Sequence, residues 1–83
     1  MKVDILLFAQ LKEAAGTDHL FLEIWEGTPV KELVEHLMEE PRFLRCKDLP
    51  FIYAVNENFV SQDRILHEAD TLALMTPVSG GAM

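Results

Sequence analysis

Two stretches of alternating side chains, one near each end of the chain, constrain the fold most. Residues 2–9 and residues 71–76 both place an apolar side chain at every second position, which is the spacing of a β-strand with one buried face. These inward positions are Val3, Ile5, Leu7, Leu72 and Leu74. We expect the two strands to pair as parallel neighbours in the centre of one sheet. A parallel pair needs a long crossover connection, usually one that contains a helix.

The segment around residues 30–38 supplies that helix. Its apolar side chains follow the i, i+3, i+4, i+7, i+8 spacing of a helix with one buried stripe. They are Val30, Leu33, Val34, Leu37 and Met38. Thr28 is predicted to cap the helix and Pro29 to occupy its first position. Pro41 limits the helix at its other end.

The remaining segments predict shorter elements. We expect a helix at 10–15, strands at 19–25, 51–56 and 59–60, and a connection at 42–50 with room for a helical turn. Gly16 is placed to end the first helix. Glu57-Asn58 is predicted to turn one strand into the next, and Asp63 to cap a single helical turn that ends at Leu66.

This order of elements predicts an α+β fold, with a mixed sheet of about five strands and the helices on one face. A chain of 83 residues is the size of a single domain. We place that domain at residues 1–76. Residues 77–83 form a C-terminal arm with a Gly-Gly pair and an Ala-Met extension.

Charge and composition exclude several classes of function. The chain has 14 acidic and seven basic residues and a net charge of −7, so it repels nucleic acids and anionic membranes. A protein with a basic docking surface is the expected kind of partner. The sequence has neither a signal peptide nor an apolar run of the roughly 18 residues that a membrane helix requires, which predicts a cytoplasmic protein.

No internal catalytic or metal site is expected. The chain has one cysteine, Cys46, and three histidines, His19, His36 and His67, without the short ligand spacings of a zinc site. It also has no glycine-rich phosphate loop after a strand and no nucleophile with a base and an acid.

Three apolar residues are predicted on the sheet face opposite the helices. The alternation of the strands turns Phe8, Phe59 and Met75 away from the main core. Large apolar groups that gather on an exposed face usually mark an interaction site, so we expect a docking surface there. The alternative is that a small domain leaves some apolar area uncovered.

The C-terminal arm is the second candidate site. Pro77 cannot donate to a sheet, and Val78, Ser79, Gly80 and Gly81 follow it. Five extended residues reach about 17 Å, and glycines without Cβ pass a narrow channel. A frayed terminus is the alternative.

Four segments together resemble a known family. They are LLFAQLKEAAG at 6–16, AVNENFVSQDRIL at 54–66, Asp70, and LALMTPVSGG at 72–81. The chain is identified by them as similar to the MoaD branch of the ThiS/MoaD sulfur-carrier family, over almost its whole length. The resemblance implies a ubiquitin-like β-grasp fold and a role as the small subunit of molybdopterin synthase, a sulfurtransferase.

The resemblance also implies roles for the candidate residues. The terminal carboxylate of Gly81 would be adenylated by an E1-like adenylyltransferase that uses ATP, and then converted to a thiocarboxylate. Its sulfur would pass to cyclic pyranopterin monophosphate in the large subunit of the synthase. Gly80 would give the arm flexibility. Phe8, Phe59 and Met75 would dock on the partner, with Pro77, Val78 and Ser79 as the arm; the chain itself would bind no cofactor.

Two departures from the family pattern stand out. The family commonly has Gly-Asp before the last strand, where this chain has Ala69-Asp70. More important, Ala82-Met83 follows Gly81, so the Gly81 carbonyl is an amide and cannot be adenylated. We expect a processing protease to remove the two residues. The alternatives are a docking or regulatory homologue that is not activated, a ubiquitin-like modifier joined to lysines, and a sulfur carrier of another pathway.

Overall fold

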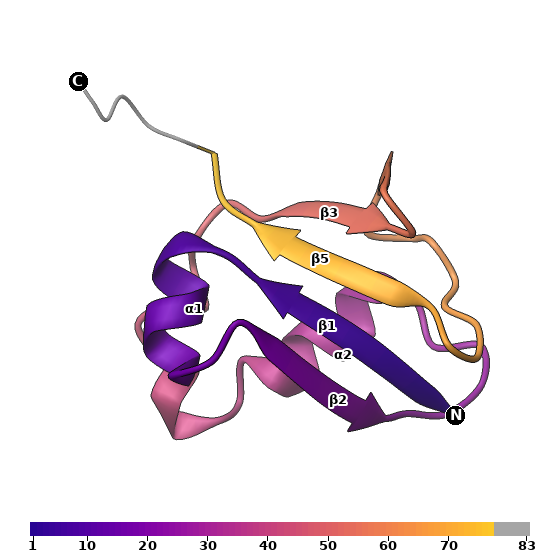
Figure 1. Cartoon of the computed structure of the whole chain (residues 1–83), viewed down its shortest axis with the longest axis horizontal. Helices are drawn as coiled ribbons and strands as arrows, with labels where there is room; N and C mark the ends of the chain where they lie inside the picture. The colour runs from indigo at the N-terminus through magenta and orange to yellow at the C-terminus, as the bar shows by residue number, and fades with distance from the viewer. Residues whose placement is uncertain (78–83) are drawn as a thin grey trace.

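The computed structural model describes residues 1–77, which form five strands, two α-helices and one short 3-10 helix (Figure 1). In chain order the elements are β1 Lys2–Leu7, α1 Ala9–Ala15, β2 His19–Glu23, α2 Val30–Leu37, η1 Pro41–Phe43, β3 Ile52–Val55, β4 Asn58–Val60 and β5 Thr71–Met75. None of these helices is long and apolar enough to cross a membrane.

The first and last strands lie side by side in the middle of the sheet. The strand order is β2-β1-β5-β3-β4, and β1 and β5 are parallel, with Ile5 opposite Leu72 and Leu7 opposite Leu74. All other neighbouring strands are antiparallel. The structure therefore confirms the predicted mixed sheet and its central parallel pair.

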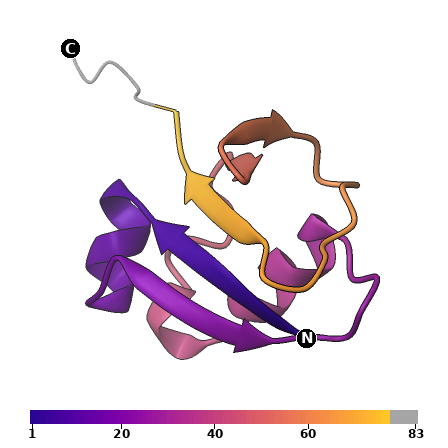
Figure 2. The same cartoon turned by 45° about the vertical axis from the view of Figure 1, so that its right-hand side comes forward.

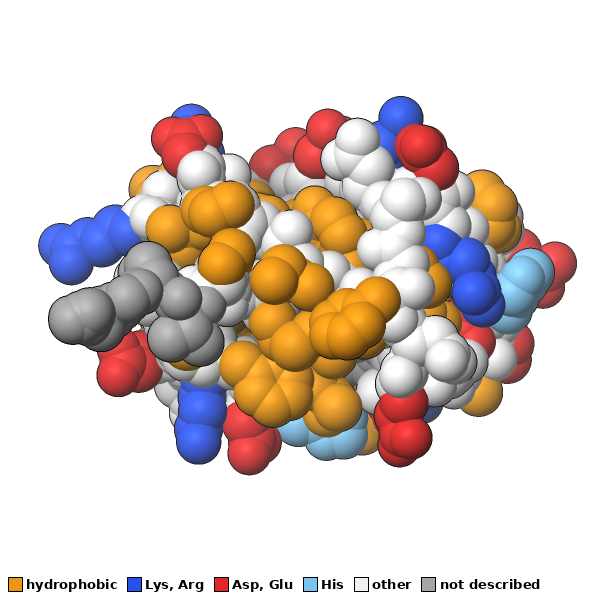
Figure 3. All heavy atoms as spheres, turned by 90° about the horizontal axis from the view of Figure 1, so that it is seen from above, with side chains coloured by type: hydrophobic (Ala, Val, Ile, Leu, Met, Phe, Trp, Pro, Cys, Tyr) orange, Lys and Arg blue, Asp and Glu red, His pale blue; other side chains and the backbone are white. Residues whose placement is uncertain are grey.

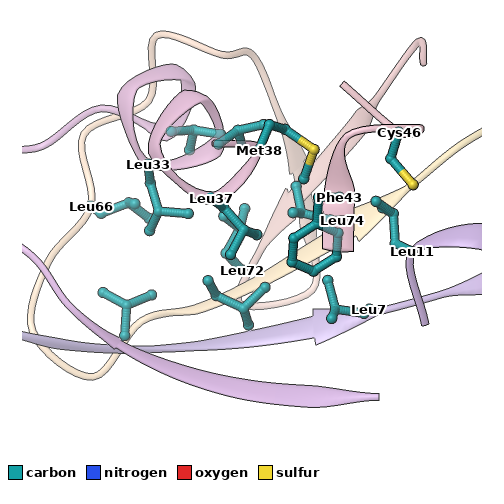
Figure 4. Packing of buried hydrophobic residues seen from close by; sticks show 14 of the residues in the cluster. Leu7, Leu11, Leu33, Leu37, Met38, Phe43, Cys46, Leu66, Leu72 and Leu74 are labelled. Atoms are coloured by element: carbon teal, nitrogen blue, oxygen red, sulfur yellow. The ribbon is translucent and has the colours of Figure 1, made fainter. Parts of the chain in front are cut away.

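The core lies between one face of this sheet and the helices (Figures 1 and 2). The alternating residues of β1 and β5 and the apolar stripe of α2 are all buried there, as predicted. Phe43 of η1 is also fully buried, and it points into this cluster between Leu37 and Leu7 (Figure 4). The connection at 42–50 thus contributes to the core through Phe43 and Cys46, which the sequence pattern did not indicate.

The prediction that Thr28 caps α2 is wrong. The Thr28 hydroxyl donates to the Trp25 carbonyl at 2.6 Å, and no side chain of residues 1–77 caps the helix. The first N–H groups of α2 are satisfied by backbone carbonyls from a distant loop: Val30 N–H donates to Arg64 at 2.8 Å and Lys31 N–H to Gln62 at 2.9 Å. A helix start needs acceptors for these N–H groups, and here tertiary structure supplies them.

The same contacts explain why Asp63 does not cap a helical turn. The Thr28 carbonyl accepts the Leu66 N–H at 2.9 Å, and Ile65 forms an isolated bridge with Pro29. These bonds hold the loop against the start of α2. Residues 61–64 form a reverse turn, in which the Arg64 N–H donates to the Ser61 carbonyl at 3.2 Å, and the Gln62 and Arg64 carbonyls are directed at the helix.

The hairpin between β3 and β4 turns one residue earlier than predicted. Val55 pairs with Asn58, so the turn residues are Asn56 and Glu57 rather than Glu57-Asn58. Both have positive φ, 50° and 72°. Positive φ at both turn residues is typical of the two-residue hairpin turn, whose backbone twist matches the twist of the flanking strands. Asparagine adopts positive φ more readily than most residues.

A buried carboxylate ties this hairpin to the start of β5. Asp70 is only 7% exposed. Its carboxylate accepts hydrogen bonds from the Asn56 side-chain NH₂ at 3.0 Å and from the His67 N–H at 2.7 Å. The side-chain oxygen Oδ1 of Asn56 accepts the Thr71 N–H at 3.0 Å. The residue before it, Ala69, has a φ of 68°. The departure from Gly-Asp therefore places a side chain in the left-handed region.

Replacing Ala69 by glycine should stabilise the fold. An L-residue in the left-handed region costs roughly 1–2 kcal/mol, while glycine loses more backbone entropy on folding, so we expect a net gain of about 1 kcal/mol. Thermal and urea unfolding measure it. The matched control is Ala14→Gly inside α1, which should lose about 1 kcal/mol. Destabilisation by Ala69→Gly would contradict the strained turn.

Removing the Asp70 carboxylate should be costly. Asp70→Ala leaves the Asn56 amide and the His67 N–H without their acceptor, which predicts a loss of roughly 1–3 kcal/mol in unfolding free energy. Asp63→Ala is the control, because the exposed Asp63 makes only a 3.6 Å contact with Lys31. Its cost should stay below about 1 kcal/mol. Equal effects of the two variants would rule out the structural role of Asp70.

Candidate functional site

The sheet face opposite the helices carries a row of apolar side chains across four strands. The register places Leu6 of β1 beside Ala73 of β5, Ala73 beside Ala54 of β3, and Ala54 beside Phe59 of β4. Residues opposite one another in a sheet point to the same face. Phe59 is 78% exposed at the end of this row, whereas Ala54 is nearly covered.

A second row lies next to the first, toward the end of β5. Met75 pairs with Ile52 of β3, and Phe8 follows Leu7, which pairs with Leu74, so the register places Phe8 beside Met75. Phe8 is 45% exposed. The structure therefore brings the three predicted docking residues, Phe8, Phe59 and Met75, onto one face.

Charged groups lie mainly around this apolar surface rather than within it. Viewed from the side of β3, hydrophobic side chains gather in the middle of the molecule and Lys, Arg, Asp and Glu lie around the edge (Figure 3). Ile52 and Ala54 belong to the surface but were missed by the sequence reasoning. Tyr53 and Val55 lie opposite the inward Leu74 and Leu72, so the alternate residues of β3 point to the other face of the sheet. The alternation within β3 could therefore have identified Ile52 and Ala54.

The turn from β1 into α1 fixes the position of Phe8. The Phe8 carbonyl accepts the N–H groups of Leu11 at 3.1 Å and Lys12 at 3.4 Å, and the Leu11 side chain is fully buried. Ala9 has a φ of 51°, so the chain turns sharply just after Phe8. The aromatic side chain is therefore presented by a turn that is anchored in the core.

The arm begins at the edge of this surface. Thr76 and the exposed Pro77 follow Met75 directly, and they are the last residues that the structure describes. The other predicted arm residues, Val78, Ser79, Gly80 and Gly81, lie outside the described residues, as do Ala82 and Met83. The described residues therefore show an apolar face, and β5, which ends at the edge of this face, is followed in the sequence by Gly80-Gly81.

Elsewhere the described residues do not gather chemically reactive groups. In residues 1–77 no three His, Cys, Asp or Glu side chains lie close enough to hold a metal ion. A groove of about 510 Å³ lies between α2 and the segment 44–53, with Tyr53 and Glu35 in its lining. Burial, and then the Glu35 carboxylate, raise the pKa of Tyr53 above its ordinary value, so the phenol is neutral at physiological pH.

Comparison with known proteins identifies relatives over nearly the full chain. The model of the ThiS family matches residues 5–81. The molybdopterin synthase sulfur carrier subunit of Escherichia coli is 35% identical over 82 residues, which cover 95% of this chain and 99% of the relative. The protein of the same name from Drosophila melanogaster is 34% identical over 84 residues, covering 98% and 92%.

Solved structures agree with this fold. A putative molybdopterin converting factor subunit 1 from Pyrococcus furiosus has a TM-score of 0.81 at 28% identity, covering 94% of this chain and 99% of that one. Small archaeal modifier protein 1 from Methanosarcina acetivorans has a TM-score of 0.75 at 26% identity, covering 96% of each chain.

A complex of subunits 1 and 2 of the molybdopterin-converting factor from Helicobacter pylori contains a further chain of this fold, with a TM-score of 0.70 at 23% identity. It covers 98% of this chain and 100% of that one. These neighbours share the ubiquitin-like β-grasp architecture. From the match to the family model and the identity to its relatives, the chain belongs to the ThiS family.

Proposed function

We propose that this protein is the sulfur-carrier subunit of molybdopterin synthase. The observation that carries the proposal is the joining of two features: an apolar face at the end of β5, and a chain that runs from that face into Val78-Ser79-Gly80-Gly81. The first feature binds a partner, and the second delivers a carboxylate into the partner's active site. The names of the relatives in Escherichia coli and Drosophila melanogaster support this reading.

The chemistry follows from the poor reactivity of a carboxylate. A carboxylate oxygen of Gly81 attacks the α-phosphorus of ATP in an E1-like adenylyltransferase, and pyrophosphate leaves. A sulfur nucleophile at the oxidation level of sulfide then displaces AMP from the acyl-adenylate, which yields the thiocarboxylate. In the synthase the thiocarboxylate sulfur forms a bond to cyclic pyranopterin monophosphate. Water then cleaves the resulting thioester, which leaves the sulfur on the pterin and regenerates the Gly81 carboxylate. The carrier supplies the acyl group, while the enzymes supply ATP binding and catalysis.

Docking would precede each transfer. The surface of Phe8, Phe59 and Met75, together with the partly exposed Ile52, offers a partner apolar contacts next to the start of the arm. The acidic chain favours partners with a basic rim around an apolar patch. The Helicobacter pylori complex of subunits 1 and 2 makes the large subunit the natural first partner to test.

Truncating Phe59 should weaken binding to the cognate large subunit without unfolding the protein. Phe59 is 78% exposed, so Phe59→Ala removes little core packing. An aromatic anchor in an interface contributes about 2 kcal/mol or more, which predicts about 30-fold weaker binding by calorimetry. Leu44→Ala is the control, since Leu44 is 57% exposed and lies on the connection after η1. Equal binding by the wild type and Phe59→Ala would contradict the proposed surface.

The Ala82-Met83 extension should block activation. While it is attached, Gly81 has no free carboxylate, so the full-length chain should release no pyrophosphate when mixed with the cognate E1-like enzyme and ATP. A chain that ends at Gly81 should react. A chain that ends at Gly80 tests whether the terminal position matters, and it should react far more slowly. Activation of the full-length chain at Met83 would overturn the requirement for a processing protease.

A second candidate function is protein modification. The specific observation that favours it is the 26% identity to small archaeal modifier protein 1 of Methanosarcina acetivorans over nearly all of both chains. The same activated Gly81 would then be attacked by a lysine amine instead of a sulfur nucleophile. Lysine-linked adducts in the native host, detected by mass spectrometry, would support this function. A sulfur-bearing free carrier without adducts would support the first.

A further inference from the structure

β2 is an edge strand with part of its backbone unpaired in residues 1–77. Met1 and Ile24 exchange two backbone hydrogen bonds, of 2.7 and 2.9 Å. In an antiparallel pair, residues bonded to the neighbouring strand alternate with residues whose N–H and C=O point the other way. The even-numbered residues of β2 therefore bond to β1, and Phe21 and Glu23 direct their N–H and C=O groups to the free edge.

This edge lacks several of the features that commonly protect one. Edge strands are commonly blocked by lysine, proline, a bulge or very short length. The β2 sequence, HLFLE, contains neither lysine nor proline, and its register with β1 is continuous over five pairs. Within β2 the Phe21 side chain is 61% exposed, and the Trp25 side chain, two residues past the end of β2, is 88% exposed. Such a strand is well suited to pair with another chain.

A groove follows the end of β2 on the side facing α2. It has a volume of about 570 Å³, and its lining combines apolar and acidic groups. The lining residues are Met1, Glu23, Ile24, Trp25, Thr28, Glu32, Leu33 and His36. A strand added to β2 would place alternate side chains into this groove and the others beside Phe21, because successive side chains of a strand point to opposite faces.

The charges around the edge of β2 indicate which charge a bound segment should carry. Glu23 and Glu32 line the groove, and among residues 1–77 no Lys or Arg does. The Met1 ammonium, also in the lining, already donates to Ile24 and lies 3.8 Å from Glu23. Lys2, opposite Glu23, is the one Lys or Arg of β1 and β2. Two copies of a chain with a net charge of −7 repel each other, whereas a basic segment is attracted.

We infer that the free edge of β2 binds an extended segment of a partner protein, with alternating apolar and basic side chains, by strand addition. This edge and β4 are at opposite ends of the sheet, and the apolar surface of Phe59 lies toward the β4 end. A partner on β2 therefore leaves the end of β5 accessible. The inference does not depend on the sulfur-carrier proposal.

A peptide titration of the full-length, isotope-labelled protein tests the inference. The probe is a short blocked peptide of alternating lysine and valine, followed by nuclear magnetic resonance. The amides of Phe21 and Glu23 should shift and exchange more slowly with solvent, and the Trp25 indole should shift. A peptide with glutamate in place of lysine should bind at least about tenfold more weakly. Shifts confined to other surfaces, or equal binding of both peptides, would overturn the inference.

A matched pair of variants isolates the backbone contribution. Phe21→Ala removes the aromatic ring, while Phe21→Pro removes the ring and also the outward N–H, a change that edge strands tolerate. The proline variant should bind the lysine-valine peptide about fivefold more weakly than the alanine variant. Equal affinities would contradict strand addition.

A modified peptide provides the same test on the unaltered protein. Methylating alternate backbone nitrogens of the lysine-valine peptide, in the register that faces β2, should abolish binding, and methylating the other set should not. Equal loss with both sets would contradict the inference. Sedimentation of the free protein should show a monomer. A dimer that Phe21→Pro dissociates would overturn the choice of partner and assign the edge to a second copy of the chain.

Discussion

The parallel pairing of β1 with β5 is the constraint on which the rest of the structure depends. Each strand contributes alternate residues to the core, and Leu7 opposite Leu74 and Ile5 opposite Leu72 form its centre. Parallel neighbours cannot be joined by a tight turn, so α2 and the long connection after it cross the sheet and cover one face. The other face stays free of helices, and that face carries the candidate docking surface.

The same pairing explains how the surface and the arm come to be adjacent. Phe8 directly follows the last residue of β1, and Met75 is the last residue of β5. The two residues are close together because parallel strands end at the same edge of the sheet. An antiparallel arrangement would have placed Phe8 at the opposite end from the arm. One topological choice therefore positions both an aromatic contact from the N-terminal segment and the start of the C-terminal arm.

Local patterns predicted most of the fold because they report burial directly. The alternation in β1 and the stripe of α2 depend only on which side of an element faces the core, and both were confirmed. Thr28 failed as a cap because the N–H groups of α2 bond to carbonyls of Gln62 and Arg64, contacts that no local rule contains. The buried role of Phe43 was missed for the same reason, since its short segment has no periodicity of its own.

The candidate site was predictable to the extent that it follows strand parity. Phe59 and Met75 follow from the alternation of their strands, and Ile52 would have followed from β3. The free edge of β2 was not predictable, because which strand lies at an edge is decided by the order of all five. The positive φ of Ala69 was not predictable either, because it depends on the turn in which Asp70 accepts the His67 N–H.

The central place of β5 has a consequence for how the protein is made. A ribosome synthesises β5 after the other four strands of residues 1–77, yet both β1 and β3 need it as their neighbour. Until residues 71–75 emerge, the two halves of the sheet have no ladder between them, and the long-range contacts that define the core cannot form. The sheet is therefore completed only when β5 joins it, and a nascent chain cannot display the candidate docking face before residues 71–75 have been synthesised.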